Sequence, residues 1–380
     1  MKILHVMHDD KHNDRIVKAF EGALPGASEY MALEKPGNIK FLTSPKIKVR
    51  NARMIAQKLV SEDFDIAIFH ALDLQKLKIL RSVPKKTKIV WIGWGFDYYS
   101  SLLKKSFNYP HGILDKLTVS KLSEMDLVSK VTIDGKDFLR RTQRFLLNQN
   151  YKRRDYEKID VFVPVLKREW DLARKENPWF KPRYFEWNYS DEAPKIFGRM
   201  QDKTSILVGN SATITNNHFD AFHRIAELGK TISFEEIICP LSYGNKKIRE
   251  MILKSGQYYF GKKFSPQTRF VGRDQYMEIF ARCHTVVMNQ VRQQGMGNIN
   301  IAMQAGSRVV LNPRSIMVEE LEDRGYKFGT IDEMGSLDNI SDFQRVNDKA
   351  LIRFWENRSS PVIIQRFVEN VLNKRESGVS

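Results

Sequence analysis

The chain has 380 residues, of which 42% are hydrophobic and 28% are charged, and its 62 Lys and Arg against 45 Asp and Glu give a formal net charge of +17. This composition excludes a disordered chain, and no apolar run approaches the roughly 18–20 residues that cross a bilayer. The length suits two domains. The cysteines, Cys239 and Cys283, have no partners at metal-ligand spacing, so we expect buried thiols in a reducing cytoplasm.

The first half of the chain predicts three parallel strands separated by helices. The strands are Ile3–Met7, Asp65–His70 and Lys88–Gly93, and the helices lie around Asp14–Glu21 and Arg50–Ser61. The apolar start is short and runs straight into polar residues. It therefore predicts a first buried strand and not a signal peptide.

The second half alternates strands and helices more regularly. It predicts strands at Ser205–Val208, Glu235–Pro240, Arg269–Val271, Thr285–Asn289 and Arg308–Leu311, and helices at Thr215–Leu228, Lys246–Ser255, Gln275–Arg282 and Asn298–Gln304. Continuous apolar strands between helices are typical of α/β proteins with parallel sheets covered on both faces. We expect two Rossmann-like domains whose parallel sheets face each other across a cleft.

A polar connector near Ser190–Lys203 predicts the boundary between these domains. It divides the chain into an N-terminal domain of residues 1–195 and a C-terminal domain of residues 196–347. The last segment, residues 348–380, is predicted to be a C-terminal helix that could cross back to the N-terminal domain.

Part of the excess positive charge lies in one basic segment. Lys136, Arg140, Arg141 and Arg144 share a predicted helix with Phe138, Phe145 and Leu146, and Tyr151–Arg154 follows. A basic amphipathic helix suits an anionic membrane surface. A solvated helix that packs its apolar face on its own domain would have the same pattern.

Two strand-to-helix junctions in the second half carry most of the functional information. Each apolar strand ends in small or amide residues: Gly209, Asn210 and Ser211 after the first, and Arg292, Gln293, Gln294, Gly295, Met296, Gly297 and Asn298 after the second. Such junctions aim helix N-termini and free backbone N–H groups at a phosphate. Two of them suggest a diphosphate ligand, with Arg292 as a fixed positive charge.

Other uses of Rossmann-like domains are disfavoured. Neither half has the Gly-x-Gly-x-x-Gly turn of a hydride-transferring enzyme, and a P-loop lysine motif is also missing. The remaining common use of twin Rossmann domains is sugar transfer from a nucleotide diphosphate.

The same segments resemble one family, the dTDP-N-acetylfucosamine:lipid II N-acetylfucosaminyltransferases of glycosyltransferase family fifty-six, which act in enterobacterial common antigen assembly. The resemblance is dense from about Ser205 to Asn312 and is carried by Ile206–Ser211, Asn217-His218, Cys239–Gly244, Arg292–Gly297, Gln304–Gly306 and Val310–Asn312. In the first half, Phe69-His70 and Trp91–Tyr98 are similar to family segments. The family's Gly-Ser-Asp after the first strand is replaced here by His8-Asp9-Asp10.

The resemblance implies a GT-B fold, with an acceptor-binding N-terminal domain and a nucleotide-sugar-binding C-terminal domain. It implies inverting transfer of a 4-acetamido-4,6-dideoxyhexose from a dTDP-sugar to a polyprenyl-diphosphate-linked saccharide, without metal or other cofactor. The enzyme would work in the cytoplasm, peripherally on the inner face of the cell membrane, in surface polysaccharide synthesis.

The donor pocket is expected to combine the two junctions with residues of two further loops. Helix N-termini, backbone N–H groups and Arg292 would neutralise the leaving diphosphate in place of a metal. Leu241, Ser242 and Tyr243 follow another strand, and Tyr243 could stack on the base or be an ordinary rim tyrosine. Glu319 and Glu320 stand where sugar transferases often bind the ribose, although a solvated helix face is the simpler explanation.

The catalytic base should come from the first half. Asp97 lies just past a strand end, where neighbouring aromatic side chains can raise a carboxylate pKa by desolvation. Asp10 occupies the first strand–helix loop, and His70, which ends another strand, is expected to bind or orient the acceptor. Each could instead be a capping or loop-solvated group. We favour Asp97, followed by Asp10.

Three alternatives stay open on the sequence. A related O-antigen or capsule transferase could use another nucleotide sugar, because small differences at one sugar position need few pocket residues to distinguish them. A basic nucleic-acid-binding protein is a different class; the sequence has no recognised nucleic-acid-binding motif, and we expect no nucleic-acid partner. A GT-B-type epimerase would act on a free nucleotide sugar without an acceptor.

Overall fold

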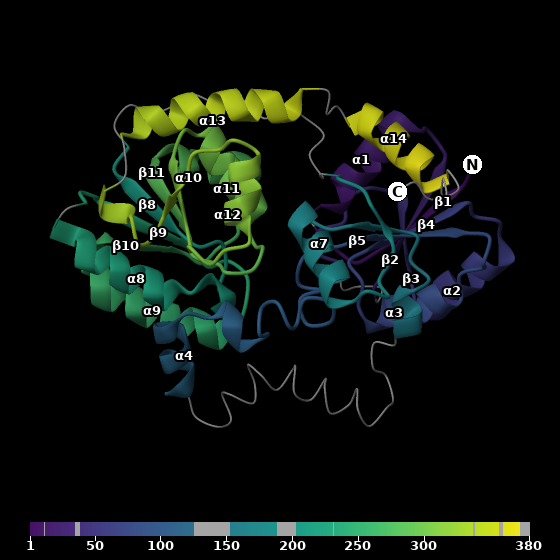
Figure 1. The fold of residues 1–380 in the computed structure, drawn as a ribbon, viewed down its shortest axis with the longest axis horizontal. Coiled ribbons are helices and arrows are strands. Elements are labelled where there is room, and N and C mark those ends of the chain that lie inside the picture. Colours follow the sequence, from purple (N-terminus) through teal and green to yellow (C-terminus); the bar gives the residue numbers. More distant parts are fainter. Residues whose placement is uncertain are drawn as a thin grey trace. The chain divides into compact units, whose positions relative to one another are not determined.

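A computed structural model describes residues 1–10, 12–34, 39–124, 153–187, 203–230, 232–336, 339–356 and 360–372. The chain forms two compact units (Figure 1). The first unit holds the described residues of 1–106, 153–187 and 360–372, and the second holds those of 107–124 and 203–356. Each unit is built on its own parallel sheet, which confirms the predicted α/β class.

The first unit has a seven-stranded parallel sheet in the order β3-β2-β1-β4-β5-β6-β7. The strands are β1 Ile3–Met7, β2 Ser28–Leu33, β3 Ile47–Arg50, β4 Ile66–His70, β5 Lys88–Ile92, β6 Val161–Val163 and β7 Arg183–Tyr184. The central strands β1 and β4 are buried along their whole length. The strand order reverses between them, and ligands of doubly wound sheets bind beside that point, at the carboxyl ends of the strands.

Helices cover the sheet of the first unit. They are α1 Asn13–Ala23, α2 Ala52–Ser61, α3 Leu74–Arg81, α6 Arg153–Tyr156, α7 Lys167–Glu176 and α14 Ser360–Leu372. The last helix, α14, packs beside α1 (Figure 1). Phe20 of α1 and Phe367 of α14 meet at 6.3 Å between ring centroids in the hydrophobic core. The last helix therefore closes the core of the unit that contains the first strand.

The second unit has a six-stranded parallel sheet in the order β10-β9-β8-β11-β12-β13. Its strands are β8 Ser205–Val208, β9 Glu236–Pro240, β10 Phe264–Gln267, β11 Cys283–Met288, β12 Arg308–Leu311 and β13 Gly329–Thr330. This order also reverses once, between β8 and β11. The two predicted phosphate junctions follow these two neighbouring strands.

Seven α-helices and five short turns lie in the described part of the second unit. The α-helices are α4 Lys116–Ser123, α8 His218–Glu227, α9 Lys246–Phe260, α10 Arg273–Ala281, α11 Met296–Gln304, α12 Met317–Asp323 and α13 Ile340–Trp355. Short 3-10 turns lie at η1 His111–Ile113, η2 Ile214–Asn216, η3 Leu228–Lys230, η4 Gly261–Lys263 and η5 Met334–Ser336.

Several predicted elements differ from the structure. The predicted strand Arg269–Val271 is wrong: the edge strand β10 is formed by Phe264–Gln267, which pairs with β9. The first unit has β2, β3, β6 and β7 beyond the three predicted strands. Strands β3, β6 and β7 have only four, three and two residues, so their pattern is weak. Strand β2 has six residues and ends in the buried run Tyr30–Leu33, which the sequence analysis overlooked. The segment from residue 348, predicted to be one C-terminal helix, contains the end of α13 and the separate helix α14.

The division into units also differs from the predicted domains. Residues 107–124, which a boundary at 195 assigns to the N-terminal domain, belong to the second unit. The reason is a cap: the Asp220 carboxylate of α8 accepts hydrogen bonds from the backbone N–H groups of Leu117 and Thr118 at 2.8 and 2.9 Å, at the start of α4. The predicted basic helix at residues 136–146 and the connector at residues 190–202 lie outside the described residues.

Candidate functional site

In the second unit, the two predicted junctions leave the sheet side by side. Strands β8 and β11 pair in parallel, with Val208 opposite Val287. The backbone N–H of Gly209 continues this pairing by donating to the Val287 carbonyl at 2.9 Å. The segment after β8 and the segment after β11 therefore begin at the same edge.

The β8 segment needs a glycine at its first position. Gly209 has φ +72°, and an added Cβ would lie 2.5 Å from Nε2 of His218. His218 is buried, and its burial lowers its pKa to about 3, so a neutral ring is held under the glycine. The absence of a side chain at Gly209 lets the loop turn tightly over α8.

Gln294 joins the two junctions. Its Nε2 donates to Asn210 Oδ1 and to Thr213 Oγ1, both at 2.9 Å, and its Oε1 accepts from the Thr215 hydroxyl at 2.6 Å. Only 9% of the Gln294 side chain is exposed, and the Asn210 and Ser211 side chains are also buried. Buried polar groups with several partners hold one geometry. The segments predicted to bind one diphosphate are thus parts of one hydrogen-bonded structure.

A third segment, after β9, joins the same edge. The Asn210 amide donates from Nδ2 to the Tyr243 hydroxyl at 3.1 Å, and the Ala212 N–H donates to the Tyr243 carbonyl at 2.8 Å. Gly244 has φ +116°, and a Cβ there would meet the Ala212 carbonyl oxygen at 2.4 Å. Leu241 is buried and Ser242 is partly buried, whereas Tyr243 is 48% exposed.

The helix α11 begins directly after Gln294. Gly295 occupies its N-cap position with φ +72° and provides no capping side chain. The backbone N–H groups of Met296 and Gly297 belong to the first turn, which has no intrahelical acceptor for them. Asn298 donates from Nδ2 to the Tyr276 hydroxyl at 2.9 Å, which holds the turn against α10.

The remaining predicted donor residues lie along the same edge. Arg292 is partly exposed and donates from Nη1 to the Gln293 carbonyl at 3.0 Å, and the Gln293 side chain is buried. Glu320 stands in α12, after the neighbouring strand β12. Its carboxylate oxygen Oε1 forms an i,i+4 ion pair with Arg324 at 2.5 Å, so Oε1 is already occupied.

The sequence interpretation missed the polar layer beneath these loops. Asn216 is fully buried; its Nδ2 donates to the Ser211 carbonyl at 2.9 Å and to the Thr213 hydroxyl at 2.7 Å. Gln290 donates to Asn216 Oδ1 from the second junction. The amide-rich composition of both junctions was the available signal, but only the fold shows which amides face each other.

A second polar cluster ties residues 107–118 to the edge of the sheet. Asp115 accepts from Asn289 at 3.0 Å and from Asn312 at 2.7 Å, and it forms an ion pair with Arg314. Asn289 and Asn312 stand at the ends of the neighbouring strands β11 and β12. Burial raises the pKa of Asp115, and the Arg314 guanidinium opposes that rise.

In the first unit, Asp97 is an occupied acceptor. Its carboxylate receives hydrogen bonds from the Leu72 N–H and from the Trp91 indole, both at 2.8 Å, and from the Trp94 N–H at 2.9 Å. It is 5% exposed. Burial raises its pKa and these hydrogen bonds oppose the rise. Asp97 thereby connects the segment after β4 with the segment after β5.

Asp10 and His70 lie at the carboxyl ends of β1 and β4. Asp10 is partly exposed, and its Oδ1 accepts from the His12 N–H at 2.9 Å. His70 is fully buried, and its Nε2 lies 3.0 Å from Nδ1 of His5 on β1. Burial holds the pKa of His70 well below its usual value. His70 is therefore a neutral interior group, not an open surface for an acceptor.

Further charged groups surround this edge. The ammonium of Lys76 is fully buried and donates to the His70 carbonyl and to the Ala71 carbonyl, the latter at 3.0 Å. Burial lowers its pKa to about 8, although Asp73, Asp97 and Asp10 act in the opposite direction. Glu169 of α7 accepts a hydrogen bond from the hydroxyl of Tyr98, in the segment after β5, at 2.6 Å. Burial raises the Glu169 pKa to about 7.

Metal clusters and membrane-spanning helices are both absent from the described part of the chain. No group of three or more His, Cys, Asp or Glu side chains there has the spacing to hold a metal ion. No helix within the same residues combines the length and apolarity that a membrane span needs.

Comparisons with known proteins agree with this architecture. The chain is similar to a structure described as trehalose-6-phosphate from E. coli bound with UDP-2-fluoro glucose, with 11% identity and a TM-score of 0.64 over 98% of this chain and 100% of that one. It is also similar to the alpha,alpha-trehalose 6-phosphate synthase from Burkholderia multivorans, with 9% identity and a TM-score of 0.65 over 97% and 96% of the two chains. At these identities the likeness shows the fold, which is GT-B.

The family comparison concerns the second unit. Residues 180–357 match the family described as 4-alpha-L-fucosyltransferase glycosyl transferase group 56. This range contains β8, β11 and the three linked segments at their carboxyl ends. The protein is therefore a glycosyltransferase with the GT-B fold, and its residues 180–357 are similar to glycosyl transferase group 56.

Proposed function

We propose that this glycosyltransferase moves a 4-acetamido-4,6-dideoxyhexose from a dTDP-sugar to a polyprenyl-diphosphate-linked saccharide in surface polysaccharide synthesis, with inversion at the anomeric carbon. The observation that carries the donor half of this proposal is the bridge from Gln294 to Asn210 at the head of α11. The sugar and nucleotide rest on the sequence resemblance described above.

The donor diphosphate would lie at the first turn of α11. The helix N-terminus carries roughly half a positive charge, and the N–H groups of Met296 and Gly297 point the same way. Arg292 stands at the mouth of this turn and supplies a full charge. As the bond from the sugar to the diphosphate breaks, negative charge accumulates on the leaving group, and fixed N–H donors stabilise it without reorganising.

The linked loops would hold the rest of the nucleotide sugar. Tyr243 is 48% exposed while its hydroxyl is held by Asn210, so its ring is positioned to pack on a base or a sugar. Leu241 and Ser242 form the inner side of that loop. Glu320 would accept a hydrogen bond from a ribose hydroxyl through Oε2, because Arg324 occupies Oε1.

The base that removes the proton of the acceptor hydroxyl would be a carboxylate of the first unit. Asp10 is partly exposed, and among the described residues its carboxylate accepts one hydrogen bond, from the His12 N–H to Oδ1, so Oδ2 is open. Asp97 is 5% exposed and already accepts hydrogen bonds from three N–H groups, so an acceptor hydroxyl has little access to its carboxylate. We therefore assign Asp10 as the base and Asp97 as the group that positions the loop, which reverses the preference from sequence alone. His70 would hold the β1–β4 edge in place.

The acceptor side of the proposal concerns the membrane. A polyprenyl-diphosphate-linked saccharide is confined to a membrane, so the enzyme would work in the cytoplasm, peripherally on the inner face of the cell membrane. The formal charge of +17 supports attraction to an anionic surface. The predicted basic helix at residues 136–146 is our candidate for this contact.

The first experiment identifies the donor. Purified protein is screened by thermal shift against dTDP, UDP, GDP and their sugars; a ligand at about a hundred times its Kd stabilises the native state by about 2.7 kcal/mol. Preference for dTDP supports the proposal. Preference for another nucleotide would instead indicate a related O-antigen or capsule transferase. The anomeric configuration of the product, measured by NMR, tests inversion.

A substitution tests the proposed diphosphate site at the first turn of α11. Arg292→Ala should lower turnover at least tenfold and leave the melting temperature unchanged, because it removes a charge facing the leaving diphosphate. Arg353→Ala is the matched control, since Arg353 is an exposed arginine on α13 of the same unit. If both variants turn over at the wild-type rate, Arg292 does not face the diphosphate.

A further inference from the structure

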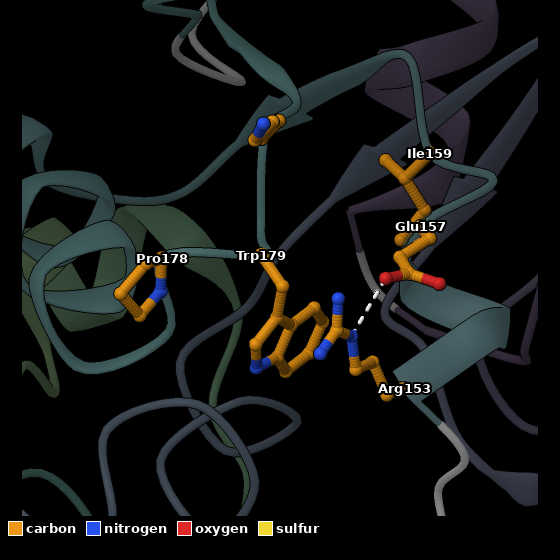
Figure 2. Close-up of a pocket in the computed structure, with 6 residues that line it drawn as sticks. Arg153, Glu157, Ile159, Pro178 and Trp179 are labelled. Atoms are coloured by element: carbon orange, nitrogen blue, oxygen red, sulfur yellow. Dashed lines mark hydrogen bonds and ion pairs between the residues drawn. The ribbon is translucent and has the colours of Figure 1, made fainter.

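The first unit contains a polar hollow at the edge of its sheet opposite to the edge that carries Asp10 and Asp97. It has a volume of about 580 Å³ and is lined by Arg153, Glu157, Ile159, Pro178, Trp179 and Lys181 (Figure 2). Ile159 comes just before β6 and Lys181 just before β7, so the hollow lies at the amino ends of these parallel strands. Asp10 and Asp97 follow the carboxyl ends of β1 and β5.

Arg153 is held in a fixed position at this hollow. Its Nε donates to Glu157 Oε1 at 2.7 Å, and its guanidinium lies 5.5 Å from the centre of the Trp179 ring (Figure 2). The side chain is nevertheless 64% exposed. Its two terminal nitrogens have no hydrogen-bond partner among the described residues. A planar guanidinium that is already oriented loses little freedom when it binds an oxyanion.

Two further donors line the hollow. The Lys181 ammonium is exposed and makes no ion pair or hydrogen bond within the part of the chain that the structure describes. The Trp179 indole N–H likewise has no acceptor among those residues. The Trp179 ring is itself fixed, because it packs on Tyr156 at 6.2 Å and on Phe180 at 6.1 Å between centroids.

The charges and the ring together define the ligand. Arg153, Lys181 and Glu157 together carry a net positive charge. The groups that lack a partner among the described residues are all hydrogen-bond donors: the Arg153 terminal nitrogens, the Lys181 ammonium and the Trp179 indole N–H. The complementary ligand is therefore an anion with several acceptor oxygens. A phosphate fits the guanidinium and the ammonium. The flat face of Trp179 and the ring of Pro178 would contact the apolar part of an ester. An inorganic anion such as sulfate would leave that surface unused.

We propose that this hollow binds a phosphate ester, separately from the edge of the sheet that carries Asp10 and Asp97. The phosphate lies between Arg153 and Lys181, and the carbon part of the ester packs on Trp179. The ester comes either from a free small molecule or from a phospholipid headgroup. This inference does not depend on the donor or acceptor proposed above.

The test compares two sources of the same chemistry with the full-length protein. Glycerol phosphate and inorganic phosphate are titrated by calorimetry, and sedimentation measures binding to phosphatidylcholine vesicles with and without phosphatidylglycerol. The test variant is Arg153→Gln with Lys181→Gln. At about fivefold per removed charge, its binding should weaken by roughly 25-fold. The control, Lys254→Gln with Lys262→Gln, removes two exposed lysines of the second unit and should bind like the wild type.

A second variant separates charge from geometry. Arg153→Lys keeps the charge but loses the planar group above Trp179, so it should weaken binding less than the double variant and more than the control. Loss of glycerol phosphate binding in the double variant indicates a free ester, and loss confined to phosphatidylglycerol vesicles indicates a headgroup. Equal binding by the wild type and the double variant to every probe, or no binding by the wild type, would overturn the proposal.

Discussion

Gly297→Ala is the sharpest test of the donor site, because it should separate the stability of the fold from the binding of the diphosphate. Gly297 is exposed in the first turn of α11, and an added Cβ would have no atom within 4 Å. Its φ is not in the left-handed region. Alanine is favoured over glycine within a helix by about 0.5–1 kcal/mol, so the melting temperature should stay the same or rise by about 1–4 °C.

The effect on binding should be in the opposite direction. If the diphosphate lies against this turn, the new methyl group occupies the space through which the backbone N–H reaches an oxygen. A hydrogen bond to a charged group contributes about 1.5–3 kcal/mol, which corresponds to an increase in Kd of about 10- to 100-fold. Calorimetric titration with dTDP measures this change, and a thermal melt without ligand measures stability.

Gly229→Ala is the matched control. Gly229 is an exposed glycine of the same unit, in the 3-10 turn after α8, and its added Cβ also meets nothing within 4 Å. It should leave both the melting temperature and dTDP binding unchanged. Wild-type affinity for dTDP in Gly297→Ala would show that no phosphate approaches this turn, and the diphosphate would then have to bind elsewhere.

Three further predictions concern the loops and the base. Gly209→Ala should destabilise the protein by about 2–5 kcal/mol, because the new Cβ would overlap His218 and the backbone is left-handed. Gly325→Ala has the same φ of +72° but no atom near its Cβ, so it should cost about 1–2 kcal/mol. Chemical denaturation measures both losses of stability, and equal losses would contradict the predicted overlap with His218. Asp10→Asn should abolish transfer at an unchanged melting temperature while Asp97→Asn lowers that temperature; an active Asp10→Asn enzyme would return the role of base to Asp97. Burial raises the Glu169 pKa from 4.5 to about 7, so the folded state binds the extra proton and the unfolding free energy should fall as pH rises from about 4.5 to 7. Glu169→Gln should remove this component of the slope, and an unchanged pH profile would show that Glu169 is ionised in the fold.

Local patterns in the chain were enough to identify the central strands. The apolar runs of β1, β8 and β12 were predicted with their observed bounds, because three to five consecutive buried side chains leave a strong signal. The junctions after β8 and β11 were found for the same reason, as small and amide residues directly after such runs. Short edge strands such as β7, with two residues, carry no comparable pattern.

The contacts that build the site could not be predicted, since they join residues distant in sequence. Gln294 and Asn210 are 84 residues apart and meet only because the sheet places β11 next to β8. Asp97 was predicted to be the base because it follows a strand among aromatic side chains, but the segment after β4 also contacts it and supplies one of its three donors. Residue types and periodicity thus determined the class of fold and led to the proposed phosphate-binding edge of the second sheet. Only the pairing of distant strands decided which polar groups are occupied and which stay open to a ligand.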